Sequence, residues 1–167
     1  MNERADTQFE VFVRARLAEL LRFGHVLTGS PHAAADLVQD ALERTLLAWP
    51  RIQKRDDPEG YVRRTMINRY ISIWRRRSRE RLVAQIPDRA SGSEPPDHSD
   101  LMWALAQLPP RARAVVVLRF YQDLSERETA AMLGCSIGTV KSQTARALAR
   151  LRTHLGAAAE KGSSWTV

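Results

Sequence analysis

The stretch from Ser125 to Leu151, SERETAAMLGCSIGTVKSQTARALARL, has the pattern of a helix-turn-helix with a basic second helix. Ser125 and Glu128 form an S-x-x-E pair, which typically begins a helix because each side chain satisfies the other residue's backbone N–H. Gly134 suits a left-handed turn, and Val140 can fill the angle between the two helices. The pattern therefore predicts a helix-turn-helix. The alternative is an ordinary helical hairpin with a solvated basic face.

The second helix of this motif carries side chains that suit duplex DNA. A helix of this kind fits the major groove, where basic and amide side chains reach phosphates and base edges. The residues on or near its outward face are Lys141, Ser142, Gln143 and Arg146. We therefore predict that this part of the chain binds DNA.

Composition narrows the class of protein. The chain has 167 residues and a net charge of +7, so one moderate domain or two small ones with a polyanionic partner are expected. Its single cysteine, Cys135, gives neither a disulfide framework nor zinc-ligand spacing. No stretch approaches the roughly 20 apolar residues of a membrane span, and the N-terminus does not resemble a signal peptide. We expect a cytoplasmic protein with no membrane insertion, no bound metal and no cofactor.

A change of composition divides the chain. The segment 86–100, IPDRASGSEPPDHSD, is acidic, rich in proline and serine and nearly free of apolar residues, so it reads as a flexible linker. Apolar residues elsewhere recur at helical spacing, and no strand pattern stands out. The prediction is an all-α fold of two small helical domains. Helices are expected near residues 7–27, 30–50, 57–79, 100–107 and 111–121, followed by the helix-turn-helix. The expected segments are a first domain at 1–82, the linker at 83–100, a second domain at 101–156 and a short tail at 157–167.

The third expected helix, GYVRRTMINRYISIWRRRSRER from Gly60 to Arg81, mixes aromatic rings with eight arginines. Such a mixture suits single-stranded nucleic acid, because arginines follow the phosphates and rings stack on exposed bases. Tyr61, Tyr70 and Trp74 are the candidate rings. Each could equally be a core residue, since aromatic residues at helical spacing are often buried.

The second expected helix carries the opposite charge. Asp36, Asp40 and Glu43 follow at i, i+4 and i+7, so they share one face, with Gln39 beside them. Carboxylates so placed could serve a metal or acid–base chemistry, but only His32 is spaced to join them. A surface that docks another protein is the more attractive interpretation.

Taken together, these segments resemble a bacterial RNA polymerase sigma factor of the extracytoplasmic-function type, and the wording of the motifs is similar to the actinobacterial SigE family. Ala35–Asp40 with Leu46–Trp49 resembles region 2.2, which docks on core polymerase. Gly60–Arg77 resembles regions 2.3 and 2.4, which open the −10 element. Leu108–Arg111 with Val115–Phe120 resembles region 4.1, and Ser125–Leu151 resembles region 4.2, which reads the −35 element.

The resemblance implies three sets of site residues and no catalytic one. The implied contacts to core polymerase are Asp36, Leu37, Gln39, Asp40 and Glu43. The implied contacts to the −10 strand are Arg63, Arg64, Asn68, Trp74, Arg75, Arg76 and Arg77. The implied contacts to the −35 duplex are Thr139, Lys141, Ser142, Gln143 and Arg146. The polar loop 51–57 is expected to form a pocket for a flipped base of the −10 element.

The function implied is that of a non-enzymatic subunit that directs core RNA polymerase to promoter DNA, with an anti-sigma factor as a further candidate partner and no small-molecule substrate. Rival hypotheses are a homodimeric helix-turn-helix regulator, a metal-dependent nucleic-acid-processing enzyme using Asp36 and Asp40, and a helical adaptor that binds polymerase without initiating transcription. The first rival leaves the acidic helix and the arginine-rich helix without a role.

Overall fold

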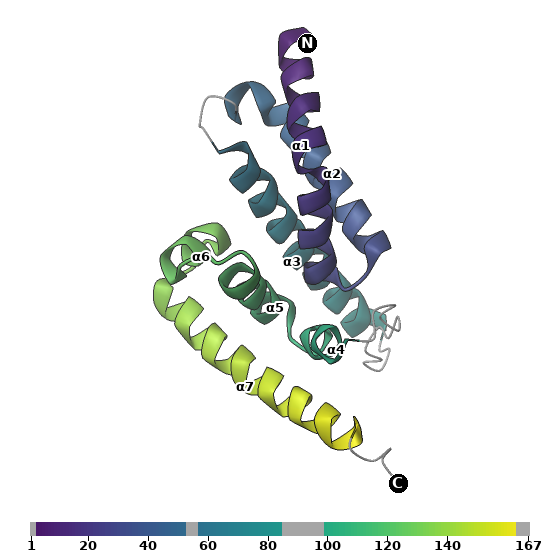
Figure 1. Cartoon of the computed structure of the whole chain (residues 1–167), viewed down its shortest axis with the longest axis vertical. Coiled ribbons are helices and arrows are strands. Elements are labelled where there is room, and N and C mark those ends of the chain that lie inside the picture. The colour runs from purple at the N-terminus through teal and green to yellow at the C-terminus, as the bar shows by residue number, and fades with distance from the viewer. Residues whose placement is uncertain (1–2, 53–56, 85–98, 163–167) are drawn as a thin grey trace. The chain divides into compact units, whose positions relative to one another are not determined.

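The computed structural model describes residues 3–52, 57–84 and 99–162, and every regular element within these ranges is a helix. Figure 1 shows their order along the chain. The helices are α1 (Glu3–Thr28), α2 (Pro31–Ile52), α3 (Pro58–Ala84), α4 (Asp100–Ala106), α5 (Pro110–Val116), the π-helical turn η2 (Val117–Tyr121), α6 (Glu126–Leu133) and α7 (Ile137–Gly162). The predicted all-α fold is confirmed.

The chain divides into two compact units, Met1–Ile73 and Trp74–Val167. This division falls inside the continuous helix α3. The domain boundaries expected at residues 82, 100 and 156 therefore stay predictions, and the central part of the expected linker, 85–98, lies outside the described residues. The backbone of α7 continues to Gly162, six residues into the expected tail, where alanines favour helix.

In the first unit, α1 and α2 form a hairpin (Figure 1). Gly29 ends α1 with a φ of 78°, in the left-handed region that favours glycine. Ser30 then caps α2, because its hydroxyl accepts a hydrogen bond of 3.3 Å from the Ala33 N–H. The stop and start signals at this corner act as the sequence predicts.

Close packing joins the helices of this unit. A Cβ at Gly24 would lie 3.2 Å from the Cβ of Ala34, so two small residues let α1 and α2 approach. Further along, the Trp49 ring lies 5.1 Å from the Phe9 ring and 5.3 Å from the Phe12 ring, measured between centroids. The buried side chains of the unit include Leu20, Phe23, Leu27, Leu37, Val38, Val62, Met66, Ile67 and Tyr70. Tyr70 is therefore a core residue, and its interpretation as a ring for base stacking is wrong.

Two helices of the first half extend beyond their expected ends. α2 passes through Pro50 and continues for two residues to Ile52, which lies in the core, and this apolar burial offsets the hydrogen bond that proline cannot donate. α3 continues to Ala84, and the Arg76–Glu80 ion pair, 3.1 Å long, joins successive turns of this extension. Arginines also suit the C-terminal end of a helix, where the macrodipole is negative.

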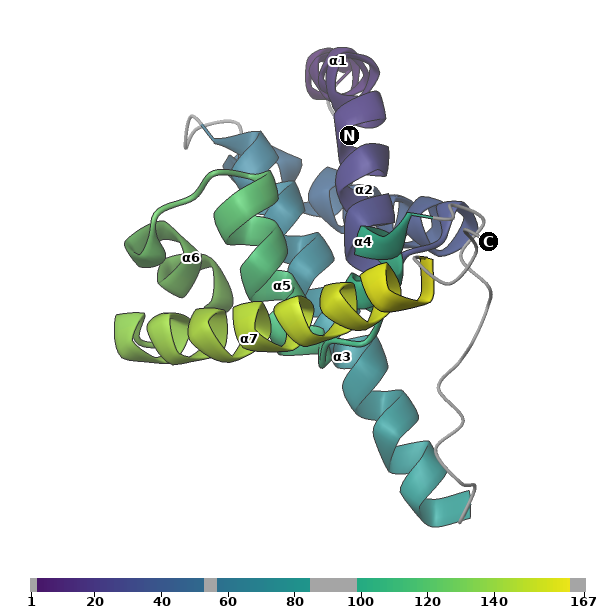
Figure 2. The same cartoon turned by 60° about the horizontal axis from the view of Figure 1, so that its bottom comes forward.

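In the second unit, the long helix α7 packs against α4, α5 and α6 (Figure 2). Apolar residues from each helix face this contact, and Leu118 and Val140 are fully buried. The other large buried side chains of the unit include Leu105, Leu108, Val115, Val117, Leu133 and Leu151. This core holds α7 by one face and leaves its opposite face in solvent.

The helix expected over 111–121 changes its winding near its end. It is α-helical only to Val116 and continues as η2, where the Gln122 N–H donates to the Val117 carbonyl over 3.0 Å. Asp123 follows with a positive φ of 54°, and the Arg119 guanidinium donates to the Leu124 carbonyl. The wider π-helical turn and the hydrogen bond from Arg119 to Leu124 redirect the chain into the helix-turn-helix. Phe120 and Tyr121 are left exposed.

Candidate nucleic-acid interface

The capping box predicted at the start of the helix-turn-helix is present. The Ser125 hydroxyl accepts a 3.2 Å hydrogen bond from the Glu128 N–H, and the Ser125 N–H donates a 2.8 Å bond to the Glu128 carboxylate. The interaction with the Ser125 hydroxyl, followed by the bond from its backbone N–H, lowers the pKa of the Glu128 carboxyl. The charged form of Glu128 is thus tied to the folded start of α6.

This carboxylate makes the stability of the motif depend on pH. Because its pKa is lowered on folding, Glu128 stabilises the folded state above the unfolded pKa, and this contribution is lost as the pH falls through the folded pKa. We expect Glu128→Ala to lower the midpoint of thermal unfolding at neutral pH, with a difference from wild type that shrinks in acid. Circular dichroism melts between about pH 7 and about pH 3 measure this difference. Ser125→Ala should cost about 1 kcal/mol at neutral pH. A difference in unfolding midpoint between Glu128→Ala and wild type that stays constant over this pH range would contradict the capping role of the carboxylate.

The turn of the motif also has the predicted geometry. Gly134 has a φ of 64°, and its N–H donates to the Ala130 carbonyl, as does the Cys135 N–H at 3.1 Å. Ala130 is buried where α6 meets α7, and Val140 is fully buried. A left-handed glycine, a small contact residue and an apolar plug together set the angle between the two helices.

The second helix of the motif presents the predicted residues mainly to solvent. Ser136 caps α7, because its hydroxyl accepts a 3.1 Å hydrogen bond from the Thr139 N–H. The side chains of Thr139, Lys141, Ser142 and Arg146 are exposed, whereas Gln143 is half-buried. Nζ of Lys141 lies 3.8 Å from the carboxylate of Glu126 on α6. Both side chains are at least partly exposed to solvent, so this ion pair is weak and the lysine can leave Glu126 for another anion. The exposed face is therefore basic and polar.

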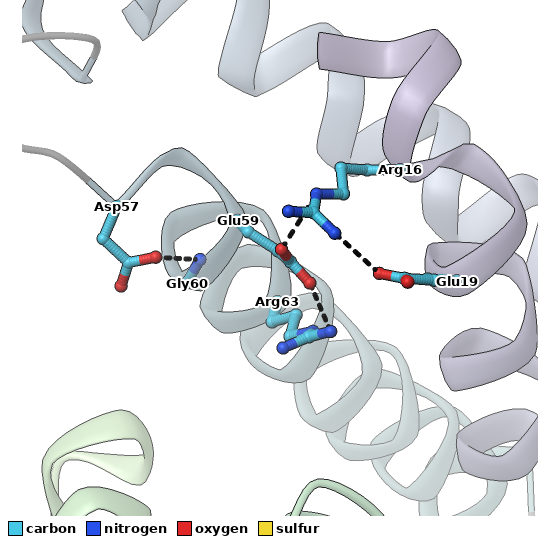
Figure 3. A network of polar contacts seen from close by, with 6 residues as sticks. All are labelled: Arg16, Glu19, Asp57, Glu59, Gly60 and Arg63. Carbon is cyan, nitrogen blue, oxygen red and sulfur yellow. Dashed lines mark hydrogen bonds and ion pairs between the residues drawn. The ribbon is translucent and has the colours of Figure 1, made fainter.

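At the start of α3, Glu59 joins two helices (Figure 3). One carboxylate oxygen lies 3.2 Å from Nε of Arg16 on α1, and the other pairs with Arg63 one turn later on α3. The Arg63 guanidinium also lies 6.0 Å from the centre of the Phe23 ring, and only 23% of the side chain is exposed. Arg63 was expected to contact DNA, but here it is directed into this network because Glu59 and Phe23 lie within its reach.

The start of α3 also explains why residue 60 is a glycine. The Gly60 N–H donates a 2.8 Å hydrogen bond to the Asp57 carboxylate (Figure 3). A Cβ at position 60 would lie 2.0 Å from that carboxylate, so a larger residue would displace the cap. Of the polar loop expected to receive a flipped base, residues 53–56 lie outside the described residues, and Arg51 and Ile52 belong to α2.

The remaining residues expected at the −10 strand lie along α3. Arg64, Asn68, Arg75, Arg76 and Arg77 are exposed, and Trp74 is half-buried. Arg76 is engaged with Glu80 in a largely exposed ion pair. One length of α3 therefore presents a dense row of positive charge to solvent.

A pocket of about 350 Å³ lies beside Asn68. Its lining is polar and cationic, and most of it comes from one face of α3. The lining residues are Arg44, Tyr61, Thr65, Asn68, Arg69 and Ser72. The sequence indicates three of them: Asn68, Tyr61 and Arg69, which is one of the eight arginines of this helix. The spacing of Tyr61, Thr65, Asn68 and Ser72, at i, i+4, i+7 and i+11, is the signal that could have found two more.

The acidic helix carries its polar residues largely on the surface. Asp36 and Glu43 are exposed, with Glu43 accepting a 3.1 Å hydrogen bond from the exposed amide of Gln39. Asp40 is less exposed and is paired with Arg44 and Arg69. Leu37 is 3% exposed, so its expected apolar contact with a partner is wrong for this structure, because the side chain is in the core. Leu47 is instead 79% exposed, one turn after Glu43.

No group of three or more His, Cys, Asp or Glu side chains in the described part of the chain is placed to hold a metal ion. None of the described helices combines the length and apolar character that a bilayer crossing requires.

The chain matches known families along most of its length. The model for Sigma-70 region 2 matches residues 12–80, and the model for Sigma-70, region 4 matches residues 99–151. The RNA polymerase sigma-E factor of Streptomyces coelicolor is 44% identical over 152 residues, which cover 89% of this chain and 86% of that protein. This chain belongs to the sigma-70 family of RNA polymerase sigma factors.

Other similarities place this sigma factor among those of the extracytoplasmic-function type. The sigma factor SigE of Mycolicibacterium smegmatis, named as of that type, is 32% identical over 92% of this chain and 64% of its own length. The solved complex of the sigma factor RpoE with the anti-sigma factor NepR from Bartonella quintana contains a similar fold. The TM-score is 0.67 at 26% identity, covering 89% of this chain and 97% of that one. The family predicted from the motifs is confirmed, and with it a function in promoter-specific transcription initiation with core RNA polymerase.

Proposed function

We propose that this sigma factor uses three surfaces in initiation: the acidic face of α2 docks on core polymerase, α7 reads the −35 duplex, and α3 holds the unpaired −10 strand. The observation that carries the proposal is the segregation of charge. Asp36 and Glu43 stand exposed on α2, whereas α3 and α7 expose mainly cations and neutral polar groups. The negative charge of α2 suits a basic surface of a protein partner, and the positive charge of α3 and α7 suits nucleic acid.

The −35 surface is the exposed face of α7. Its N-terminal residues enter the major groove in the usual docking of a helix-turn-helix, and the helix N-terminus favours a phosphate. Thr139 and Lys141 are assigned to phosphates, and Ser142 and Arg146 to base edges. Gln143 is half-buried, which supports a role at the margin of the contact rather than at its centre.

The −10 surface follows α3. The exposed arginines at 64 and 75–77 would track phosphates, while Asn68 and the pocket beside it would hold an unpaired nucleotide. Separating base pairs costs about 1.4 kcal/mol of stacking per step, so each captured nucleotide must offset a cost of that order. Arg63 contributes indirectly, by holding Glu59 and so the start of α3.

The docking surface consists of Asp36, Gln39 and Glu43, and we add Leu47 in place of Leu37. Exposed acidic residues beside an exposed leucine suit a partner surface that is basic at its rim and apolar at its centre. Asp40 lies on the same helix, but its carboxylate is already paired within the unit.

The proposal assigns the chain no catalytic step and no cofactor, and it places the protein in the cytoplasm, where polymerase and chromosome meet. An anti-sigma factor is a further candidate partner, because the structurally similar RpoE of Bartonella quintana is bound to one.

The proposal is tested by mixing the purified protein with core RNA polymerase and following co-elution. Transcripts from a promoter library of its own genome are then mapped. Co-elution together with start sites that share upstream elements supports the proposal. Failure to bind core polymerase, combined with tight binding to duplex DNA alone, would favour a stand-alone regulator.

Arg146 offers a sharper test of the −35 assignment. We expect Arg146→Ala to weaken binding of the holoenzyme to promoter DNA by about 1–3 kcal/mol and to relax preference at one −35 position. Binding to a library of −35 variants measures both effects. Arg152→Ala, which removes an exposed arginine from a different face of α7, is the matched control. A loss that is uniform over all variants would instead assign Arg146 to a phosphate.

A further inference from the structure

The carboxylate of Asp40 receives two arginines from different helices. Nε of Arg44, one turn later on α2, donates a 3.0 Å hydrogen bond to Oδ2 of Asp40. Nε of Arg69 on α3 lies 3.1 Å from the same oxygen. The Asp40 side chain is 29% exposed, so water screens these pairs only in part. One carboxylate oxygen thus joins α2 to α3.

Both of these arginines line the pocket beside Asn68, whereas Asp40 does not. The other lining groups are a phenol ring, two hydroxyls and an amide, from Tyr61, Thr65, Ser72 and Asn68. A ring for stacking, polar groups for a base edge and two cations for a phosphate are the groups that an unpaired nucleotide needs. Asp40 stands behind the two cations rather than among the groups that would touch the ligand.

The pairing leaves donors of both arginines for a ligand. A guanidinium has five N–H donors in a fixed fork, and Asp40 engages the Nε edge of each. The buried Nε of Arg69 is not aligned as a hydrogen bond to Asp40 and has no other acceptor among the described residues. Fixing two long side chains on one carboxylate also orders them before a ligand arrives, which lowers the entropy lost on binding.

Asp36 provides the contrast on the same helix. Its side chain is 70% exposed, and Nε2 of His32 lies 3.7 Å from its carboxylate. Asp36 is free to meet a protein surface, whereas Asp40 is committed to two arginines. The two aspartates therefore differ in what they contact, although the sequence places them one turn apart on one face.

We propose that Asp40 is a positioning residue for the −10 strand: it holds Arg44 and Arg69 at the pocket so that their guanidinium groups take a phosphate of the unpaired strand. This inference rests on the proposed function, and it goes beyond that function by assigning Arg44 and Arg69 to the strand and Asp40 to their orientation. A residue that acts only through others is recognised by coupling, because its effect disappears once the residues it positions are removed.

The experiment uses holoenzyme at saturating core polymerase, so that weaker docking does not enter the measurement. The probe is a fork-junction DNA with an unpaired −10 strand, built on a start site mapped with the wild-type protein. Affinities are measured for wild type, Asp40→Ala, Asp40→Asn, Arg44→Ala/Arg69→Ala and the triple variant. Circular dichroism checks that each variant is folded. Glu10→Ala removes an exposed carboxylate on α1, outside the proposed docking surface, and is the matched control for loss of one acidic charge.

We expect Asp40→Ala to weaken fork-junction binding about tenfold in the wild-type background and not at all in the Arg44→Ala/Arg69→Ala background, since neighbours acting as a unit are coupled to this extent. Asp40→Asn keeps an acceptor and should fall between wild type and Asp40→Ala. Glu10→Ala should not weaken fork-junction binding by saturated holoenzyme.

Tighter fork-junction binding by Asp40→Ala than by wild type would overturn the inference. If Asp40 acted only as a negative charge near DNA, its removal would strengthen binding, because the repulsion of phosphates would be relieved. An equal loss in both backgrounds would also overturn it, since Asp40 would then not act through the arginines. If wild-type holoenzyme failed to bind the fork junction at all, the proposed function itself would fail, and the inference with it.

Discussion

Reversing the two exposed carboxylates of α2, in Asp36→Arg/Glu43→Arg, is expected to weaken binding to core polymerase by about 100-fold or more. Both side chains are exposed on the proposed docking surface, and placing like charges together across an interface costs several kcal/mol, where each 1.4 kcal/mol is tenfold in affinity. Titration of core polymerase with a fluorescently labelled sigma factor measures the loss. The change should be larger at low salt, because salt screens exposed charges.

A matched control separates docking from total charge. Asp6→Arg/Glu10→Arg on α1 changes the net charge by the same amount at side chains outside the proposed docking surface. We expect this variant to bind core polymerase nearly as the wild type does. An equal loss in the two double variants would show that overall charge controls the affinity, and it would remove the assignment of the docking surface to α2.

Replacement of Trp49 by alanine is expected to lower the free energy of unfolding of the first unit by about 3–5 kcal/mol, the usual loss for a buried tryptophan. Trp49 is 4% exposed and packs on the Phe9 and Phe12 rings, so its removal opens a large cavity between α1 and α2. Because a domain is typically stable by only about 5–15 kcal/mol, such a loss is a large share of the total. Urea unfolding followed by circular dichroism measures it.

Two further variants test the cause of that loss. Trp49→Phe keeps a ring in the cluster and removes an indole N–H that has no acceptor among the described residues, so it should cost much less than Trp49→Ala. Leu47→Ala, two positions earlier and exposed, should change stability by less than about 0.5 kcal/mol. If Leu47→Ala were as destabilising as Trp49→Ala, the ring cluster would not be the source of the stability.

The helix-turn-helix was predictable because its signals act over a few residues. A capping box, a left-handed glycine and a buried plug each depend on neighbours within about one helical turn, and the structure contains each of them at Ser125, Gly134 and Val140. The same holds for the corner at Gly29 and Ser30. Interactions that are local in the chain can be inferred from the order of residues alone.

Burial across helices was less predictable. Leu37 follows the exposed Asp36, Tyr70 follows the half-buried Arg69, and the sequence left each of them open to a surface role. Their burial depends on which side of each helix meets another helix. A pattern along one helix shows that an apolar face exists, but the width of the face that is covered depends on the packing partner.

The sequence by itself determined the helical fold, the helix-turn-helix, the opposite charges of the second helix and the third, and the family to which the chain belongs. Only the tertiary structure decided the partners of the long charged side chains. Arg16 on α1 reaches Glu59 on α3, and Arg69 on α3, which lines the pocket, reaches Asp40 on α2. An arginine reaches several possible partners, and which one it meets depends on where a different helix places its carboxylate, a distance that the order of residues does not contain.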